Sequence, residues 1–262
     1  MSMQVYLAAL ETGDYVFDTM PDDYIEYGLV SYYYLKDDAQ FERIKSKCKR
    51  ILIDSGAHSF QHGKKVDFHQ YTLQYRDFVA KYTDDPKVTG FFEMDVDNVT
   101  GYETVLELRK MLDAVSDKII PVWHNNRGVE DFYAMCEAYT GRRVSITGFS
   151  NNDIMDEQYN AFINVAHKFG CNIHILGMTR FGLIKTLNLH KDDSFDSSSW
   201  KQTGIFGGVS LVNGDKNVVK FSSIEGLKVS YKPLITANLI SLVRAQHIWQ
   251  DEDNSVYFKG GG

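Results

Sequence analysis

The chain has few cysteines and few prolines, and it lacks any long hydrophobic run. Its three cysteines, Cys48, Cys136 and Cys171, are widely separated, and no C-x-x-C pair occurs. This spacing argues against a disulfide framework or a cysteine-rich zinc site, and it favours a reducing compartment. No apolar run approaches the roughly 20 residues that a membrane helix needs, and no basic segment precedes the short apolar run at the N-terminus. We therefore expect a cytoplasmic protein that makes no use of a membrane.

Several catalytic and nucleotide-binding signatures are also missing from the sequence. Neither G-x-G-x-x-G nor G-x-x-x-x-G-K-[ST] occurs, so the usual backbone cradles for dinucleotides and phosphates are not expected. Asp95-Val96-Asp97-Asn98 begins like a calcium loop, but Thr100 stands where that loop requires glycine. The same Asp-x-Asp spacing could hold a divalent metal on a nucleotide sugar, and this keeps a metal-dependent glycosyltransferase as an alternative.

The composition is that of a globular protein. The 262 residues are 44% hydrophobic and 24% charged, and 28 Lys+Arg against 35 Asp+Glu give a net charge of −7. An acidic balance argues against a surface built for indiscriminate nucleic-acid binding, although local basic patches remain compatible with it. The length suits one large core, and no linker or repeat divides the chain. We predict a single domain over residues 1–262.

Short apolar runs alternate with helix-length segments over most of the chain. Strands are predicted at Gln4–Leu10, Arg50–Asp54, Val88–Met94, Lys118–Trp123, Val144–Gly148 and Asn172–Leu176. Amphipathic helices are predicted at Phe68–Tyr82, Tyr102–Val115, Val129–Tyr139 and Gln158–Phe169. Parallel βαβ units follow, and with one or two later strands they predict an α/β fold of the (β/α)₈ TIM-barrel type. An open doubly wound sheet is the alternative, because periodicity alone does not show closure.

The pattern changes after about residue 200. Asn213-Gly214 separates two alternating runs and predicts a hairpin over about 209–221. A closing helix is predicted over about 233–249, with Pro233 at its start.

Polar residues gather where the predicted strands end, which is the edge that carries the active site in parallel α/β folds. Carboxylates follow three of the extended segments, at Asp54, at Asp95 and Asp97, and at Asp196, and His124 follows another. Each alone has a plain structural interpretation: an aspartate after a strand often caps the next helix, and a histidine there is often only hydrogen-bonded. Together they favour a paired-carboxylate site that acts on a glycosidic bond, with Asp54 and Asp196 dividing the roles of nucleophile and proton carrier.

The motifs that carry these residues have a family resemblance. They are D-S-G-A-H-S-F at Asp54–Phe60, the acidic strand end at Asp95–Asp97, T-G-F at Thr147–Phe149, H-I-L-G at His174–Gly177 and F-D-S-S-S-W at Phe195–Trp200. In this order, over roughly residues 50 to 200, the chain resembles the tRNA-guanine transglycosylase superfamily. It is most similar to the compact phage and bacterial relatives that insert 7-deazaguanine bases into DNA. The resemblance implies a (β/α)₈ barrel and a pentosyltransferase that needs no cofactor or metal.

The resemblance also implies roles for individual residues. Asp196 would be the nucleophile that bonds covalently to C1′, and Asp54 the general acid or base. Asp95 or Asp97 would read the guanine edge. His58 or Phe60 would stack on the base, a contact that contributes roughly 1–3 kcal/mol. Further substrate-binding positions implied by these motifs are Ser55, His124, Gly148, Phe149, Gly177, Met178 and Trp200.

The chain departs from the tRNA enzymes in two places. It has no C-x-C-x-x-C zinc subdomain, and the glycine-rich motif of those enzymes is reduced to Ile146–Phe149. Both regions hold the anticodon arm in the relatives, so DNA is the preferred substrate over tRNA, with guanine or 7-deazaguanine as the exchanged base. Such an enzyme would act in the cytoplasm, in the host's if a phage encodes it. A DNA glycosylase that excises a modified base is a further alternative. The sequence leaves the oligomeric state open.

Overall fold

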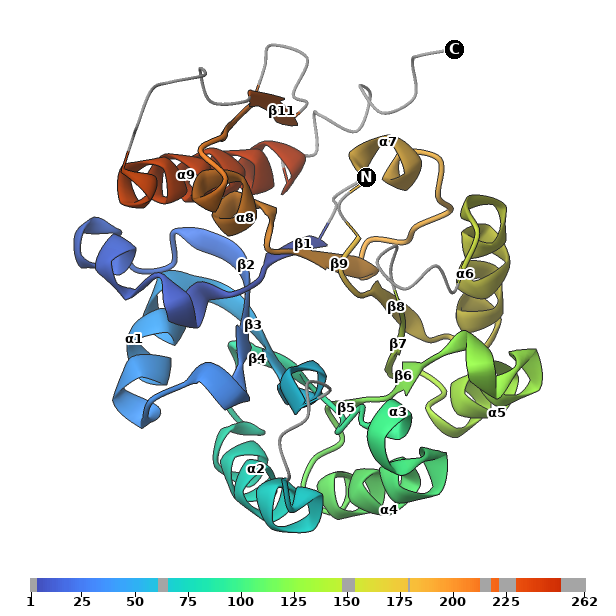
Figure 1. Ribbon diagram of the computed structural model, residues 1–262. Coiled ribbons are helices and arrows are strands. Elements are labelled where there is room, and N and C mark those ends of the chain that lie inside the picture. The colour runs from blue at the N-terminus through green and yellow to red at the C-terminus, as the bar shows by residue number, and fades with distance from the viewer. Residues whose placement is uncertain are drawn as a thin grey trace.

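The structure is a computed structural model that describes residues 4–60, 66–147, 154–178, 180–212, 218–221 and 230–250. Parallel strands form its centre and helices surround them (Figure 1). The strands are β1 (Gln4–Leu7), β2 (Ile25–Ser31), β3 (Cys48–Asp54), β4 (Val88–Phe92), β5 (Ile119–Ile120), β6 (Val122–Trp123), β7 (Arg143–Ile146), β8 (Asn172–Ile175) and β9 (Ser194–Ser197). Their order in the sheet is β5-β4-β3-β2-β1-β9-β8-β7-β6.

The two ends of this order meet at Pro121. Only that residue separates β5 from β6, so the chain itself joins the two edges of the sheet. Proline has no backbone N–H to give to a ladder, which explains why the predicted strand over 118–123 is interrupted there. The Pro121 carbonyl still accepts a hydrogen bond from the Ser145 N–H at 2.9 Å. The result is a nearly closed, all-parallel barrel of the TIM type, and the open doubly wound alternative is wrong.

Helices cover the outside of the barrel (Figure 1). Those that follow strands in the manner of βαβ units are α1 (Asp38–Lys47), α2 (Phe68–Tyr82), α4 (Tyr102–Asp113), α5 (Val129–Ala138) and α6 (Tyr159–Lys168). Shorter helices are α3 (Asp97–Thr100), α7 (Phe181–Ile184) and α8 (Ser199–Ile205). Side-chain caps start two of the long helices: Asp37 accepts from the Gln40 N–H and Asp67 from the Gln70 N–H. Such caps satisfy N–H groups that the helix itself leaves unpaired.

The strand β2 and the helix α1 are among the elements that were not predicted from the sequence. β2 lies between β1 and β3 and carries Gly28, where a Cβ would come within 2.6 Å of the Cys48 Sγ atom. A glycine inside a strand normally weakens the strand pattern, and here it allows close packing. α1 is rich in charged residues, which obscures its periodicity.

The core has an inner and an outer part. The inside of the barrel is filled by Tyr6, Ala8, Tyr27, Leu29, Leu52, Phe92, Ile120 and Val122. Two larger clusters lie between the strands and the helices. All three cysteines are buried and free, as expected for a chain without disulfides. The barrel is therefore a packed scaffold, and its strand ends are held at fixed positions.

The last helix packs against the barrel at the junction of β1 and β2. These two strands are paired at a single position, Leu7 with Gly28. The helix α9 (Tyr231–Gln250) places Gln246 over this seam, where its Nε2 donates to the Val5 and Tyr27 carbonyls at 2.6 and 2.7 Å. The strands β10 (Val209–Val212) and β11 (Val218–Phe221) pair antiparallel, and the predicted Asn213-Gly214 turn lies outside the described residues.

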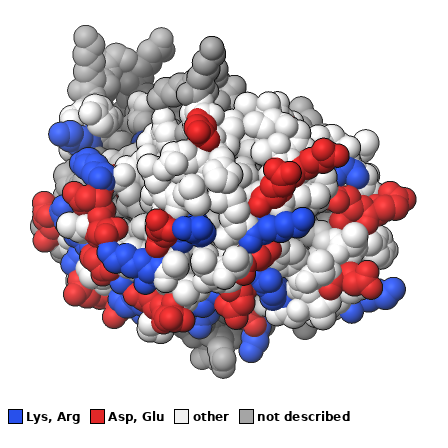
Figure 2. Space-filling view, turned by 90° about the horizontal axis from the view of Figure 1, so that it is seen from below, with Lys and Arg blue, Asp and Glu red and all other residues white. Residues whose placement is uncertain are grey.

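The outer surface carries charges of both signs. Figure 2 shows the face that lies at the bottom of Figure 1, where α2 and α4 run, and Lys and Arg are interspersed there with Asp and Glu. Exposed ion pairs such as that of Lys81 with Asp38 join charges of opposite sign on the protein surface. Within the described part of the chain, no helix is both long and apolar enough to cross a bilayer.

Candidate active site

A cavity of about 480 Å³ opens at the carboxyl ends of the strands. Residues from β1, β2, β3, β4, β6, β7, β8 and β9, or from the segments directly after them, line it. Its polar lining includes Glu11, Asp54, Asp95, His124, Thr147, Asp196 and Gln202, and its apolar lining includes Leu29, Phe92, Val122 and Leu176. The edge of the barrel predicted from the strand ends thus brings Asp54, Asp95 and Asp196 together in one cavity.

Asp54 is the last residue of β3 and is held by a tight turn. The Gly56 N–H donates to its Oδ2 at 3.2 Å, and the Ser55 Oγ donates to the Glu93 carbonyl at 2.7 Å. Gly56 has φ +83, and a Cβ there would come within 2.2 Å of the Tyr33 Cβ, so only glycine fits this turn. Burial, followed by the charge of Asp196, raises the pKa of Asp54 to about 6. Asp54 can therefore take up and release a proton near neutral pH.

Asp196 lies in β9 and keeps a small exposed fraction, 13% of its side chain. Its Oδ1 accepts the Gly177 N–H at 2.7 Å and lies 3.3 Å from the His174 Nε2. His174 is fully buried in β8, and its Nδ1 lies 2.8 Å from the Ser194 Oγ. Burial lowers the pKa of His174, so the neutral ring is favoured and its Nε2 proton can point at Asp196. Both contacts are made to Oδ1, and neither engages the other oxygen of Asp196.

Asp95 follows β4 and is paired with His124, which follows β6. The His124 Nε2 lies 2.7 and 2.8 Å from the two Asp95 oxygens. Burial disfavours the charged ring, but the hydrogen bond and charge of Asp95 outweigh burial, and the pKa of His124 is raised. The pair places a carboxylate in the cavity with a fixed orientation.

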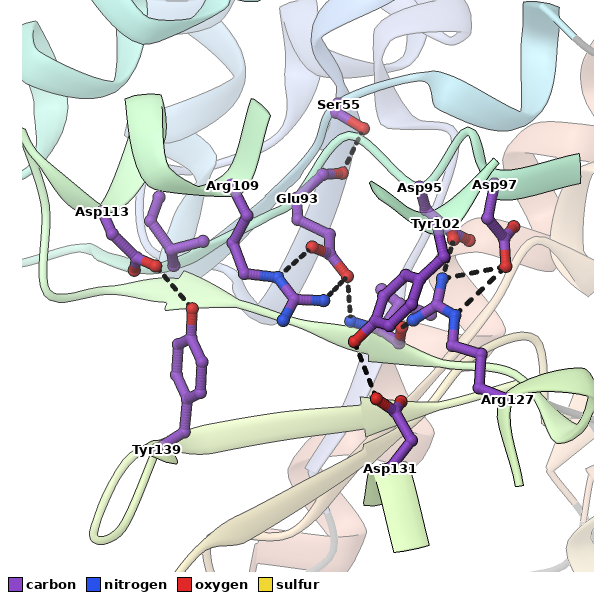
Figure 3. A network of polar contacts seen from close by, with 12 residues as sticks. Ser55, Glu93, Asp95, Asp97, Tyr102, Arg109, Asp113, Arg127, Asp131 and Tyr139 are labelled. Carbon is purple, nitrogen blue, oxygen red and sulfur yellow. Dashed lines mark hydrogen bonds and ion pairs between the residues drawn. The ribbon is translucent and has the colours of Figure 1, made fainter. Parts of the chain in front are cut away.

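Asp97 is directed toward Arg127, as Figure 3 shows. The Arg127 Nη2 and Nε donate to Asp97 Oδ2 at 2.9 and 3.2 Å, and both side chains are only 3% exposed. The ring of Tyr102 covers the guanidinium at 4.1 Å. Asp95 lines the cavity and Asp97 does not. The sequence left open whether Asp95 or Asp97 would bind a base. Only Asp95 could contact a ligand in this cavity.

A second buried ion pair supports the same strand end. Arg109 of α4 donates through Nε and Nη2 to Glu93 at 2.5 and 3.0 Å, and the Val122 N–H donates to Glu93 at 2.6 Å. Figure 3 shows the two arginines side by side, one on Glu93 and one on Asp97. These contacts fix the segment that carries Asp95 between them.

Asp95, Asp97 and His124 also form a group that could hold a metal ion. One ligand atom from each lies within 4.8 Å of the others. Carboxylate and imidazole ligands suit several divalent metals. However, the Arg127 guanidinium already binds Asp97 and lies 3.6 Å from Asp95, so a cation would have to displace or tolerate this positive charge.

The remaining predicted residues have different positions. Met178 and Trp200 are fully buried, and neither lines the cavity. The Trp200 Nε1 donates to the Ala8 carbonyl at 2.8 Å. Ser55 is also fully buried. Gly177 lines the cavity. Gly148 and Phe149 lie outside the described residues, as do the side chains of His58 and Phe60.

Glu11, Tyr34 and Gln202 are among the residues that line the cavity but were not predicted from the sequence. Glu11 follows the first predicted strand directly, so the rule that polar residues gather at strand ends could have found it. Tyr34 follows β2, which was not predicted. Its ring is 52% exposed, and its hydroxyl accepts from the Ser59 Oγ at 3.1 Å.

The chain matches no protein-family model and no curated protein.

Proposed function

We propose that the protein exchanges a guanine in nucleic acid, DNA in preference to tRNA, for a 7-deazaguanine base through a covalent aspartyl intermediate. One observation carries this proposal: Asp54 and Asp196 share a cavity, and their mutual charge helps to raise the pKa of Asp54 to about 6. A pair of neighbouring carboxyl groups is the usual requirement for breaking a glycosidic bond, and a raised pKa suits the member that carries the proton. The resemblance of the motifs to guanine transglycosylases is in agreement.

Asp196 is the nucleophile in this scheme. Its Oδ1 is held by Gly177 and His174, which leaves Oδ2 to attack C1′ as the bond to guanine breaks. The departing base takes the electron pair and needs a proton, which Asp54 supplies. In the second half, Asp54 accepts the proton of the incoming base, whose nitrogen displaces Asp196 from C1′.

Asp95 recognises the base. A carboxylate suits the adjacent N1–H and amino donors of guanine, and His124 fixes the orientation of Asp95. The apolar walls formed by Leu29, Phe92 and Leu176 suit the faces of a flat ring. A duplex substrate would have to flip the base out of its stack, at a cost of a few kcal/mol.

Incubation with DNA and labelled guanine tests the proposal. Wild-type protein should transfer label into the polymer, and Asp196→Asn should abolish transfer because an amide is a very weak nucleophile. Asp77→Asn is the matched control, since Asp77 is 72% exposed and pairs only with its neighbour Arg76 in the described contacts. Absence of incorporation by the wild type, or an Asp196→Asn variant as active as the wild type, would overturn the proposal.

The same incubation distinguishes base exchange from a DNA glycosylase, and a chelator distinguishes it from a metal-dependent glycosyltransferase. If water replaces the incoming base, abasic sites form without incorporation, and the protein is a glycosylase. A metal-dependent glycosyltransferase is favoured by one observation, the grouping of Asp95, Asp97 and His124. That activity would disappear with a chelator and return with the metal, whereas base exchange by Asp196 would be insensitive to both.

A further inference from the structure

A buried carboxyl group in the cavity has no role in the scheme above. Glu11 lies just after β1, is only 5% exposed, and lines the same cavity as Asp54 and Asp196. Carboxylates are rarely buried without an ion pair. Backbone N–H donors, including that of Ser31, and more weakly the positive charge of Lys201 favour the ionised form of Glu11, but burial outweighs them. The buried glutamate is therefore more stable when it carries a proton.

Two local features of the chain hold Glu11 at the cavity, the backbone conformation of Ala9 and a hydrogen bond from Gln40. Ala9 has φ +66, a left-handed conformation that costs a residue with a side chain free energy. The Gln40 Nε2 atom donates to the Glu11 carbonyl at 2.9 Å from α1. These two features turn the chain back over the barrel mouth after β1. Strain and a dedicated buried side chain therefore maintain Glu11 at the cavity.

Ser31 connects the carboxyl group of Glu11 to the strand position of Asp54. The Ser31 N–H donates to the Glu11 Oε2 at 3.3 Å, and Ser31 is the direct neighbour of Asp54 in the β2–β3 register. Burial, and to a lesser degree the charge of Asp54, raises the pKa of Glu11 to about 7, above the value of about 6 for Asp54. The first proton taken up by these two neighbours on lowering the pH therefore rests mainly on Glu11.

We propose that Glu11 stores the proton that Asp54 delivers to the departing base. This inference rests on the proposed base exchange. As the C1′–N bond breaks, its electron pair goes to the base nitrogen, Asp54 gives its proton to the base, and Glu11 gives its proton to Asp54, directly or through a cavity water. When the incoming base loses its proton, the transfers run in reverse. Glu11 acts through Asp54 and positions the proton.

Carbon-13 NMR of glutamate-labelled protein tests the storage of the proton without any activity measurement. The carboxyl signal that disappears in Glu11→Gln belongs to Glu11. It should titrate near pH 7, whereas a midpoint near the ordinary glutamate value of about 4.3 would overturn the proposal.

The pH profile of base exchange tests the use of that proton. In Glu11→Gln, Asp54 is the only carrier, so the fall in rate on the alkaline side should move from about pH 7 to about pH 6. The rate above pH 7 should then drop about tenfold, while the rate below about pH 6 changes little. Glu107→Gln, on the exposed face of α4, is the control and should match the wild type.

A merely structural Glu11 gives a different result. It predicts that Glu11→Gln lowers the rate by the same factor at every pH, or leaves it unchanged, and either result would overturn the proposal. If the wild type exchanges no base while Glu11 still titrates near pH 7, the proposed function fails and the storage of the proton does not.

Discussion

Asp54 combines a position in the cavity with a cost in the free energy of unfolding. Its pKa in the folded protein, about 6, is above the ordinary 3.8, so between these values the native state binds more protons than the unfolded chain. The free energy of unfolding therefore falls as the pH rises through this window, by up to about 3 kcal/mol for a shift of about two pKa units. The ionised carboxylate above pH 6 is the destabilising form.

Replacing Asp54 by asparagine should remove this cost. We predict that Asp54→Asn has about the same stability as the wild type at about pH 4 and is more stable at about pH 7.5, by about 1–3 kcal/mol. Urea unfolding at both pH values measures the difference, and base exchange should be lost in the same variant. A variant that is less stable than the wild type at about pH 7.5 would contradict the raised pKa.

At the level of single residues, the carboxylates that line the cavity could be predicted from the sequence, whereas the residues packed around the cavity could not. Asp54, Asp95 and Asp196 could be named because the ends of parallel strands meet at one edge, whatever the details of packing. Trp200 and Met178 belong to motifs beside the cavity, but burial of large apolar side chains places them in the core. The choice between Asp95 and Asp97 depended on Arg127, thirty residues further along the chain, and no local pattern indicates that pair.

At the level of elements, the buried pair of Glu93 and Arg109 ties α4 to the end of β4. Glu93 is fully buried and Arg109 nearly so. We predict that Arg109→Met costs about 3–5 kcal/mol in the free energy of unfolding at neutral pH, because Glu93 is left buried without its partner. The double variant Glu93→Gln with Arg109→Met should regain part of this loss.

Urea unfolding of these variants checks that prediction. The control is Lys81→Ala, which removes an exposed ion pair with Asp38 and should cost less than about 1 kcal/mol. Equal losses in Arg109→Met and Lys81→Ala would mean that the buried pair contributes no more than a surface one.

The packing of the turn after β3 can be tested by comparing Gly56 with a second glycine of similar backbone conformation, Gly101. Gly56 and Gly101 both have positive φ, +83 and +88, but a Cβ would clash with Tyr33 only at Gly56, and it meets nothing within 4 Å at Gly101. Gly101→Ala should therefore cost only the conformational term, about 1–2 kcal/mol. Gly56→Ala should cost clearly more in thermal or urea unfolding, and equal costs would contradict the tight packing of this turn.

Element prediction succeeded where one period dominated the pattern. The helix over Phe68–Tyr82 has the predicted bounds, and the strand ends at Asp54 and Trp123 agree as well. β2 was missed because Gly28 and the following tyrosines do not form a recognisable alternation, although close packing against Cys48 requires that glycine. Tertiary packing thus decided an element that local propensity could not indicate.

At the scale of the whole molecule, the carboxylates of the cavity are separate from the charged residues of the outer surface. The net charge of −7 includes four carboxylates that line the cavity and do not belong to the outer surface, Glu11, Asp54, Asp95 and Asp196. The outer face in Figure 2 carries interspersed charges of both signs. A nucleic acid bound by this protein should therefore be held through a few local phosphate contacts, and its affinity should fall only moderately with salt.

The central claim of the account is that Asp196 forms a covalent bond to the sugar. The most direct measurement is intact mass spectrometry of the protein after incubation with a guanine-containing oligonucleotide and rapid denaturation, without an incoming base. We predict an added mass equal to the oligonucleotide less guanine, located at Asp196, present in the wild type and in Asp77→Asn and absent in Asp196→Asn. Base exchange without any such adduct, or an adduct that persists in Asp196→Asn, would contradict the account.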